Sequence, residues 1–328
     1  MTMHAAEIFP APIPERYRLL DDVQVLDLPD PEWLIDGILQ RRSLFVLYGP
    51  SGAYKTTIVS GVQVALATGG EWFGHPVLIR GASIYIGAED PSGYKMRLSA
   101  QKRAAGLPLT TAIGCYCIPE AIDLHDPVSI AGFIRLARDS GGVFEVVIID
   151  TFAASTPGAN ENAAEDMTIA MKAALQIATG LGVAVGIVHH SNAAGSRERG
   201  HSAMRGAADT MISVTQVDDV ILVECSKQRN GPPFAPVTLK PVPLPDGGIT
   251  LRLASQVLQS SGLTTAQTKA LAVLRDTFTA DGATKAEWQR ACHDVAERTF
   301  HRAAKILLER RHITMNGSHF RVAAGASR

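Results

Sequence analysis

The chain has 328 residues, of which 46% are hydrophobic and 19% charged, and its formal net charge is −1. This composition supplies a buried core and excludes a disordered chain, and the length favours two domains. No run approaches the ~18 uninterrupted apolar residues of a membrane span, and the proline-rich start lacks a signal-peptide pattern. The four cysteines form no Cys-x-x-Cys pair, which favours a reducing, cytoplasmic compartment.

Short apolar runs and helical stretches follow one another along most of the chain. Residues 1–40 are predicted to form a proline-rich arm that ends in a short helix near residues 33–39. The predicted strands cover 44–48, 83–88, 146–149, 183–188 and 220–225, and the predicted helices cover 55–68, 91–105 and 164–179. A hairpin-like region then extends to residue 253. Uninterrupted apolar strands alternating with helices predict an α/β fold with a predominantly parallel sheet.

The pattern changes after a predicted linker at residues 256–263. Two capping boxes, Thr264 with Gln267 and Thr284 with Glu287, predict helices that run to Phe278 and to about residue 294. A third helix is predicted from about residue 297 to 311, followed by a hairpin over 313–322 with an Asn316-Gly317 turn. Three helices and a hairpin in this order predict a small winged helix-turn-helix domain over residues 264–328.

The strand at 44–48 leads into a glycine-rich loop and then into a helix. This order matches the phosphate-binding template G-x-x-x-x-G-K-[ST], except that Tyr54 stands where the template has glycine. Backbone N–H groups of such a loop face phosphates, Lys55 would reach the β- and γ-phosphates of ATP, and the Thr56 hydroxyl would bind Mg²⁺. The predicted nucleotide-binding residues are Gly49, Pro50, Ser51, Gly52, Ala53, Tyr54, Lys55, Thr56 and Thr57.

Four of the predicted strands end in polar residues, as a site at the carboxyl ends of a parallel sheet requires. Asp150 follows an apolar strand well downstream of the loop, which predicts an aspartate that holds Mg²⁺ through water. Glu89 is the candidate base for the attacking water, and Asp90 is expected to cap a helix. His189-His190 and Ser226 onward follow the other two strands. Each of these could instead be a solvated polar group at a strand end.

Five separated motifs, in order, resemble those of plasmid RepA-type hexameric helicases and of the lysine/arginine finger in DnaB-type replicative helicases. They are Gly49–Thr56, Ala88–Pro91, Ile148–Asp150, His189-His190 with Arg199–Ser202, and Ser226–Pro232. The resemblance spans about residues 30–255 and implies a RecA-like P-loop ATPase domain over 41–255. It implies that Glu89 is the catalytic glutamate, that His190 senses the γ-phosphate, and that Lys227 and Arg229 reach the neighbouring subunit's ATP. It therefore implies a homo-oligomeric ring, a hexamer. Tyr54, His201 and the C-terminal domain depart from the family pattern.

Two regions are candidates for nucleic-acid binding. In a RecA-like ring, the loops at 155–166 and 192–205 would line a central channel, where Arg197, Arg199 and Arg205 would contact single-stranded DNA. On the third C-terminal helix, Arg298, Arg302 and Lys305 lie opposite the core face of Phe300, Ala303, Ala304, Leu307 and Leu308. That placement predicts a recognition helix for duplex DNA, with His319 and Arg321 on the wing. The alternatives are a surface loop and a domain for protein contacts.

Charge is distributed unevenly between the two predicted domains. Residues 262–328 hold 11 Lys and Arg against 6 Asp and Glu, a net of +5, so the rest of the chain is acidic. Three functions fit unequally. The first is a nucleic-acid-dependent ATPase of phage or plasmid replication that acts as a ring helicase. The second is an ATP-gated DNA-binding regulator or loader that does not unwind. The third, a small-molecule kinase, leaves Lys227, Arg229 and the C-terminal domain unexplained.

Overall fold

The computed structural model describes residues 18–87, 89–160, 163–190, 202–217, 219–255, 263–278, 282–310 and 312–323. The chain divides after residue 32 into two units. In the first unit, the short helix α1 (Asp22–Leu26) begins with a capping box between Asp21 and Gln24. The backbone N–H of Gln24 donates to Asp21, and the side chain of Gln24 accepts from the Asp21 N–H. None of the five α1 residues is buried.

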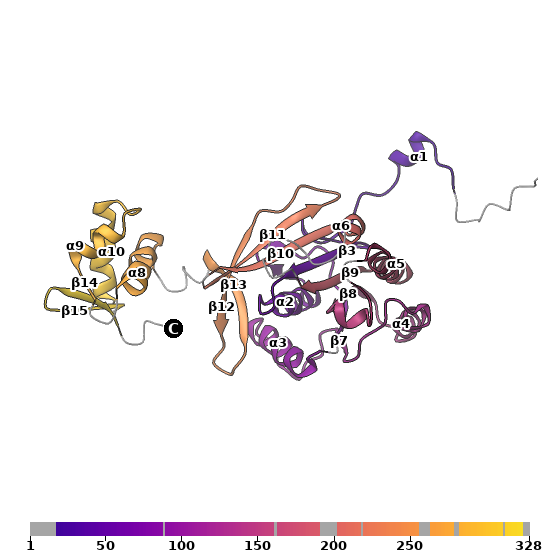
Figure 1. Cartoon of the computed structure of the whole chain (residues 1–328), viewed down its shortest axis with the longest axis horizontal. Coiled ribbons are helices and arrows are strands. Elements are labelled where there is room, and N and C mark those ends of the chain that lie inside the picture. Colours follow the sequence, from indigo (N-terminus) through magenta and orange to yellow (C-terminus); the bar gives the residue numbers. More distant parts are fainter. Residues whose placement is uncertain are drawn as a thin grey trace, which may run out of the picture. The chain divides into compact units, whose positions relative to one another are not determined.

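A large mixed sheet forms the framework of the second unit. Its strands are β3 (Leu44–Gly49), β6 (Ala82–Ile86), β7 (Cys115–Ile118), β8 (Phe144–Asp150), β9 (Ala184–His190), β10 (Thr210–Val217), β11 (Val220–Gln228), β12 (Val237–Pro243) and β13 (Ile249–Leu253). Within the described residues their order is β13-β12-β11-β10-β3-β9-β8-β6-β7 (Figure 1). All neighbours from β10 to β7 are parallel, and β11, β12 and β13 continue the sheet in antiparallel fashion. The predicted α/β fold with a mostly parallel sheet is confirmed.

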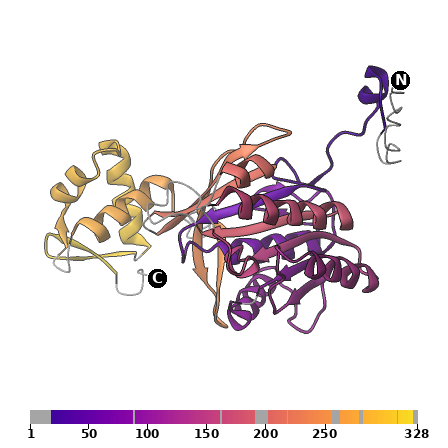
Figure 2. The same ribbon diagram turned by 45° about the vertical axis from the view of Figure 1, so that its right-hand side comes forward.

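Helices cover both faces of this sheet (Figure 2). They are α2 (Lys55–Thr68), α3 (Pro91–Ala104), α4 (Pro127–Asp139), α5 (Ala164–Leu181) and α6 (Ser202–Ala207), with a 3₁₀ turn, η1, at Ala153–Ser155. Successive β3 residues point to opposite faces: Phe45 and Leu47 join the core with α2, whereas Leu44 and Val46 join the core with α4 and α5. Because both faces are buried, the strand is apolar throughout.

The helix that the sequence predicts near residues 33–39 is absent, and that prediction was wrong. The segment instead forms a small hairpin of β1 (Trp33–Ile35) and β2 (Leu39–Gln40). Gly37 has a φ of +65°, a left-handed value that turns the chain between the two strands. Leu34 and Ile35 are fully buried in the α2 side of the core. A second small hairpin joins β4 (Glu71–Trp72) to β5 (His75–Pro76).

One predicted strand runs in an unexpected direction. The sequence analysis placed the residues after β11 at the carboxyl edge of the parallel strands, but β11 is antiparallel to β10. Gln228 pairs with Thr210, and Thr210 pairs with Phe45, near the start of β3. The segment that follows β11 therefore lies at the amino edge of β3, opposite the glycine-rich loop. The sequence did not predict β10, whose insertion beside β3 reverses the direction of β11.

The C-terminal residues form three helices and a small antiparallel sheet. The helices are α8 (Thr265–Thr277), α9 (Lys285–Ala291) and α10 (Glu297–Glu309), and the strands are β14 (Ala283–Thr284), β15 (Ile313–Asn316) and β16 (His319–Val322), in the order β14-β16-β15. Both predicted capping boxes are confirmed. The hairpin is confirmed, but its turn lies at residues 317–318, because Asn316 pairs with His319. The sequence did not predict β14. Residues 256–262 of the predicted linker lie outside the described residues.

A buried tryptophan organises the C-terminal core. Trp288 is fully buried, and its indole N–H donates to the Ala270 carbonyl oxygen at 2.7 Å. Its ring meets Phe300 edge-on, with centroids 5.0 Å apart, and also contacts Phe320. The indole thus joins α8, α10 and the small sheet. Among the described residues of the whole chain, no helix is both long enough and apolar enough to cross a membrane.

Candidate nucleotide-binding site

The glycine-rich loop connects a buried strand to the start of a long helix. Gly49 ends β3, and a Cβ atom at this position would overlap the carbonyl oxygen of Val214 on β10. Gly52 has a φ of +80°, which only glycine adopts without strain. Lys55 is the first residue of α2, so the free backbone N–H groups of the first helical turn face the loop. The loop is therefore shaped to hold an anion at a helix N-terminus.

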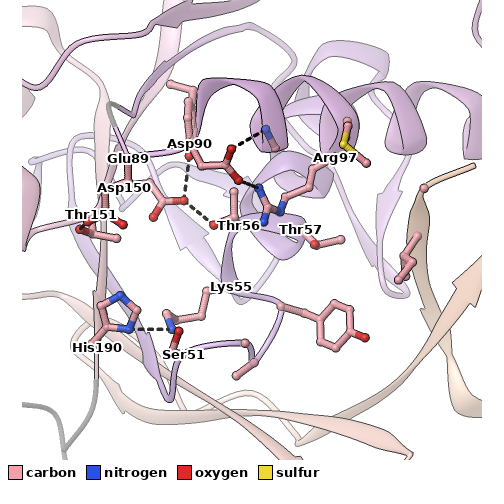
Figure 3. A pocket seen from close by; sticks show the side chains of 18 residues that line it. Ser51, Lys55, Thr56, Thr57, Glu89, Asp90, Arg97, Asp150, Thr151 and His190 are labelled. Atoms are coloured by element: carbon pink, nitrogen blue, oxygen red, sulfur yellow. Dashed lines mark hydrogen bonds and ion pairs between the residues drawn. The ribbon is translucent and has the colours of Figure 1, made fainter.

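A cavity of about 740 Å³ opens beside this loop (Figure 3). Residues 51–57 form one wall, and Glu89, Asp150 and His190, from the ends of three other strands or the loops after them, form another. The structure thus brings together most of the side chains that the sequence singled out. Gly49 and Pro50 do not line the cavity.

Lys55 is folded back onto the loop. Its ammonium group donates to the carbonyl oxygens of Gly49, at 2.9 Å, and Pro50, at 2.7 Å. The Lys55 Nζ atom also lies 3.4 Å from His190 Nδ1. Burial lowers the pKa of Lys55, and the negative charges of Asp150 and Glu89 partly oppose this effect. A phosphate in the cavity would offer this buried cation stronger acceptors than backbone carbonyls.

Two oxygen ligands suited to Mg²⁺ meet on the other side of the loop. The Thr56 hydroxyl donates to Asp150 Oδ2 at 2.7 Å. Burial raises the pKa of the Asp150 carboxyl, an effect that hydrogen bonds from Thr56 and Tyr85 partly oppose. Mg²⁺ uses one or two carboxylates together with phosphate oxygens, so this pair fits the metal of a metal–nucleotide complex. Among the described residues, no group of three or more His, Cys, Asp and Glu side chains could hold a metal alone.

Glu89 and Asp90 are adjacent in sequence but differ in their surroundings. Glu89 faces the cavity, where its Oε1 accepts a hydrogen bond from the Thr151 hydroxyl at 2.5 Å. Asp90 caps α3 by accepting from the Gly93 N–H at 2.8 Å, as the sequence predicted, and it also pairs with Arg97 at 3.3 Å. Glu89 is therefore the carboxylate available for chemistry, whereas Asp90 starts the helix.

The two consecutive histidines also differ in environment. His189 is buried, and its ring meets that of Phe152 edge-on at a centroid distance of 5.4 Å. His190, one residue further along β9, lines the cavity beside Lys55. This separation follows from strand geometry, because successive side chains point to opposite faces. Only His190 is placed to respond to a bound phosphate.

Tyr54 occupies the loop position where the phosphate-binding template has glycine. Its φ of +63° and ψ of +19° are left-handed, a region that costs a residue with a Cβ atom about 1–2 kcal/mol. The side chain is partly buried and packs against the α2 side of the core. The loop thus keeps the backbone shape that glycine normally provides, with the strain offset by packing of the aromatic ring.

Replacing Tyr54 by Gly and by Ala separates backbone strain from side-chain packing. Both variants remove the aromatic ring, but only Tyr54→Gly relieves the left-handed strain. We expect Tyr54→Gly to be about 1 kcal/mol more stable than Tyr54→Ala in urea unfolding. Equal stability of the two variants would contradict a strained loop.

Several cavity residues carried no sequence signal. Tyr85 is an interior residue of β6, Met96 and Arg97 lie on α3, and Gly248 and Ile249 come from the β12–β13 hairpin. Nothing in the local sequence indicates that a hairpin more than 190 residues after the loop reaches the same cavity. Thr151 could have been suspected, because it follows Asp150 at the end of β8.

Lys227 and Arg229 lie away from this chain's own cavity, at the opposite edge of the sheet. The Lys227 ammonium donates to the carbonyl oxygens of Arg205, at 2.5 Å, and Ala208, at 2.6 Å, near the end of α6. Arg229 donates to the Gly206 carbonyl at 2.9 Å and pairs with Asp209 at 2.7 Å. Within one chain, these cations therefore cap a helix C-terminus.

The candidate nucleic-acid contacts are only partly described. Arg197 and Arg199 lie outside the described residues, as does part of the 155–166 loop. Arg205 is on α6, where its guanidinium donates to the Ser226 carbonyl at 2.8 Å. On α10, Phe300, Ala303, Ala304 and Leu307 are buried and Leu308 is partly buried, whereas Arg298, Arg302 and Lys305 are exposed.

Comparison with known proteins assigns the family. No curated protein matches the chain. Solved structures similar to it include the RadB recombinase, with 15% identity and a TM-score of 0.45 over 61% of this chain and 87% of that one. Another is the ATPase domain of a replicative helicase, with 12% identity and a TM-score of 0.43 over 61% of this chain and 81% of that one. The AAA domain model AAA_25 matches residues 12–196, more than half of the chain and including the loop, Glu89, Asp150 and His190. The chain therefore belongs to this AAA domain family.

Proposed function

We propose that this protein is a RecA-like, nucleic-acid-dependent ATPase of phage or plasmid replication, a helicase that hydrolyses ATP between the subunits of a hexameric ring. One observation carries the proposal. Lys55, Thr56, Glu89 and Asp150 meet in one cavity, whereas the cations Lys227 and Arg229 lie at the opposite edge of the same sheet. A chain with this arrangement completes its site only with a neighbouring copy.

Each cavity residue has a defined role in this proposal. Lys55 exchanges its bonds to loop carbonyls for phosphate oxygens. Thr56 and Asp150 hold Mg²⁺, which neutralises charge on the transferred phosphoryl group. Glu89, positioned by Thr151, accepts the proton of the attacking water. His190, 3.4 Å from Lys55, responds to the γ-phosphate. Lys227 and Arg229 of the next subunit stabilise the charge that develops as the phosphoryl group leaves.

Stimulation by DNA tests this function. We expect single-stranded DNA to increase the ATPase rate, and the protein to assemble into a ring when Mg²⁺ and a non-hydrolysable ATP analogue are present. Steady-state ATPase assays with and without DNA, together with particle size and symmetry from electron microscopy, measure both. An unchanged rate with DNA, or a monomer at all concentrations, would contradict the proposed motor.

The C-terminal residues support a second candidate function, an ATP-gated DNA-binding regulator or loader. We propose that residues 264–328 form a winged helix-turn-helix domain that binds duplex DNA, joined by a linker to an ATPase domain over 41–255. The exposed cations Arg298, Arg302 and Lys305 lie on the face of α10 opposite its buried residues. The net charge of +5 in residues 262–328 favours a polyanionic partner.

Neutralising the exposed face of α10 is expected to weaken duplex binding. The triple change of Arg298, Arg302 and Lys305 to Ala should leave DNA-independent ATPase activity intact. The salt dependence of duplex affinity should fall in slope by about one for each phosphate that the variant no longer binds. Fluorescence anisotropy at several salt concentrations measures this. A triple change of the exposed cations Lys95, Arg135 and Lys172 to Ala is the control. Equally weakened binding in both triple variants would argue against a recognition helix.

A further inference from the structure

One oxygen of Asp150 accepts two hydroxyl hydrogen bonds. Thr56 donates to Asp150 Oδ2 at 2.7 Å, and the Tyr85 phenol donates to the same oxygen at 2.9 Å. Tyr85 comes from β6, the strand next to β8, where it pairs in register with Ile148, two residues before Asp150. Its side chain is buried, with 4% of its surface exposed. The phenol thus approaches the carboxylate from within the fold, whereas Thr56 approaches it from the loop.

The position of the Tyr85 ring is fixed on several sides. A Cβ atom at Gly87 would overlap the ring, so glycine at that position makes room for it. The ring stacks on Tyr94 of α3, with centroids 3.8 Å apart and an interplanar angle of 3°. Tyr94 in turn donates to Gln63 Oε1 at 3.0 Å, and Gln63 donates to Ser83 at 2.9 Å. A buried chain of contacts therefore links the ring to α2, α3 and β6.

This arrangement constrains how Asp150 presents its charge. A carboxylate oxygen has about two lone-pair directions, and the two hydroxyl donors occupy those of Oδ2. No hydrogen bond to Oδ1 is made by the residues that the structure describes. A carboxylate held in this way cannot turn to exchange its two oxygens without breaking both bonds. The same atom, Oδ1, is then always the one turned away from both hydroxyl groups.

We propose that Tyr85 is a positioning residue for the Mg²⁺ of the metal–nucleotide complex, acting by holding the Asp150 carboxylate in one orientation. This inference rests on the proposed function, in which Asp150 holds that metal. Partners that orient a metal ligand typically change metal affinity by about 10–100-fold when they are removed. Thr56 belongs to the phosphate-binding template, whereas no template includes Tyr85. The inference therefore concerns this chain's own residues.

The change Tyr85→Phe tests the proposal in the full-length protein, because it removes one oxygen atom and keeps the stacked ring. We expect Mn²⁺, a spectroscopic substitute for Mg²⁺, to bind the ADP complex about 10–100-fold more weakly, as measured by electron paramagnetic resonance. ADP affinity without metal should stay at the wild-type value. In ATPase assays, the Mg²⁺ concentration for half-maximal rate should rise more than kcat falls.

The matched control is Tyr94→Phe, which removes the hydroxyl of the stacked partner and leaves Asp150 untouched. Wild-type Mn²⁺ affinity in Tyr94→Phe, with weakened affinity in Tyr85→Phe, supports the proposal. Wild-type affinity in Tyr85→Phe would overturn the role of Tyr85 alone. Equal weakening in both variants would also overturn it, because packing would then be the cause. Failure of the wild-type protein to bind Mn²⁺ with ADP would overturn the proposed function together with this role.

Discussion

Glu89→Gln is expected to lower kcat for ATP hydrolysis by about 10²–10⁴-fold, the range for removing a general base. The substitution keeps the size of the side chain and an oxygen that can accept the hydrogen bond from Thr151. The cavity wall should therefore keep its shape while it loses the group that takes a proton. Binding of a fluorescent ATP analogue should stay near the wild-type affinity, and a single-turnover assay measures the chemical step.

Asp90→Asn provides a matched control for this prediction. Asp90 is the adjacent carboxylate, and Asn caps a helix about as well as Asp does. The control also removes the ion pair with Arg97, in which both side chains are more than one-third exposed, so its cost is small. An equal loss of kcat in both variants, or loss of ATP binding in Glu89→Gln, would show that Glu89 supports the fold rather than the reaction.

Arg229→Ala is expected to lower kcat by about 10³–10⁵-fold, the contribution of an arginine that reaches a phosphoryl group from a neighbouring molecule. ATP binding should remain, because Arg229 lies away from the cavity of its own chain. Its contacts within the chain supply a competing explanation, since it pairs with Asp209 and binds the end of α6. Steady-state assays on the assembled protein measure the effect.

Asp209→Asn separates the two explanations. It weakens the pair with Arg229 but keeps an oxygen for the Leu44 N–H, which donates to Asp209 at 2.8 Å. If Arg229 acts only within its own chain, this variant should lose as much activity as Arg229→Ala. If it acts on a neighbour, Asp209→Asn should stay active.

Mixing two inactive proteins gives a second readout of action between subunits. A Glu89→Gln subunit still carries Arg229, and an Arg229→Ala subunit still carries Glu89. In a random mixture, about a quarter of the interfaces join an intact glutamate to an intact arginine, so activity should reappear. No recovery after subunit exchange would argue against a site shared between chains.

Local patterns in the sequence were sufficient to find one wall of the cavity. The loop at residues 49–56 lies between a strand and a helix, and Asp150 and His190 each end a buried strand. These features depend on residues that are close in sequence, so apolar runs and turn chemistry reveal them. The capping boxes at Thr264 and Thr284 were predictable for the same reason.

Features that depend on pairing between distant segments were not predictable. The antiparallel direction of β11 follows from β10, whose polar residues concealed it as a strand. Tyr85 reaches Asp150 only because β6 and β8 are neighbours in the sheet. Residues 33–39 were predicted as a helix because a short apolar run contains little information about its period, and Gly37 decides the outcome through a turn.

The direction of β11 also limits how copies of this chain can assemble. The cavity and the Lys227–Arg229 segment lie at opposite edges of one sheet, so the two surfaces that would meet in a shared site differ from each other. Such an interface is heterologous, and a two-fold symmetric dimer cannot form it. Each added copy satisfies one surface and offers another. An open chain of copies therefore always ends with an unused half-site at each end, whereas closure by rotation leaves none.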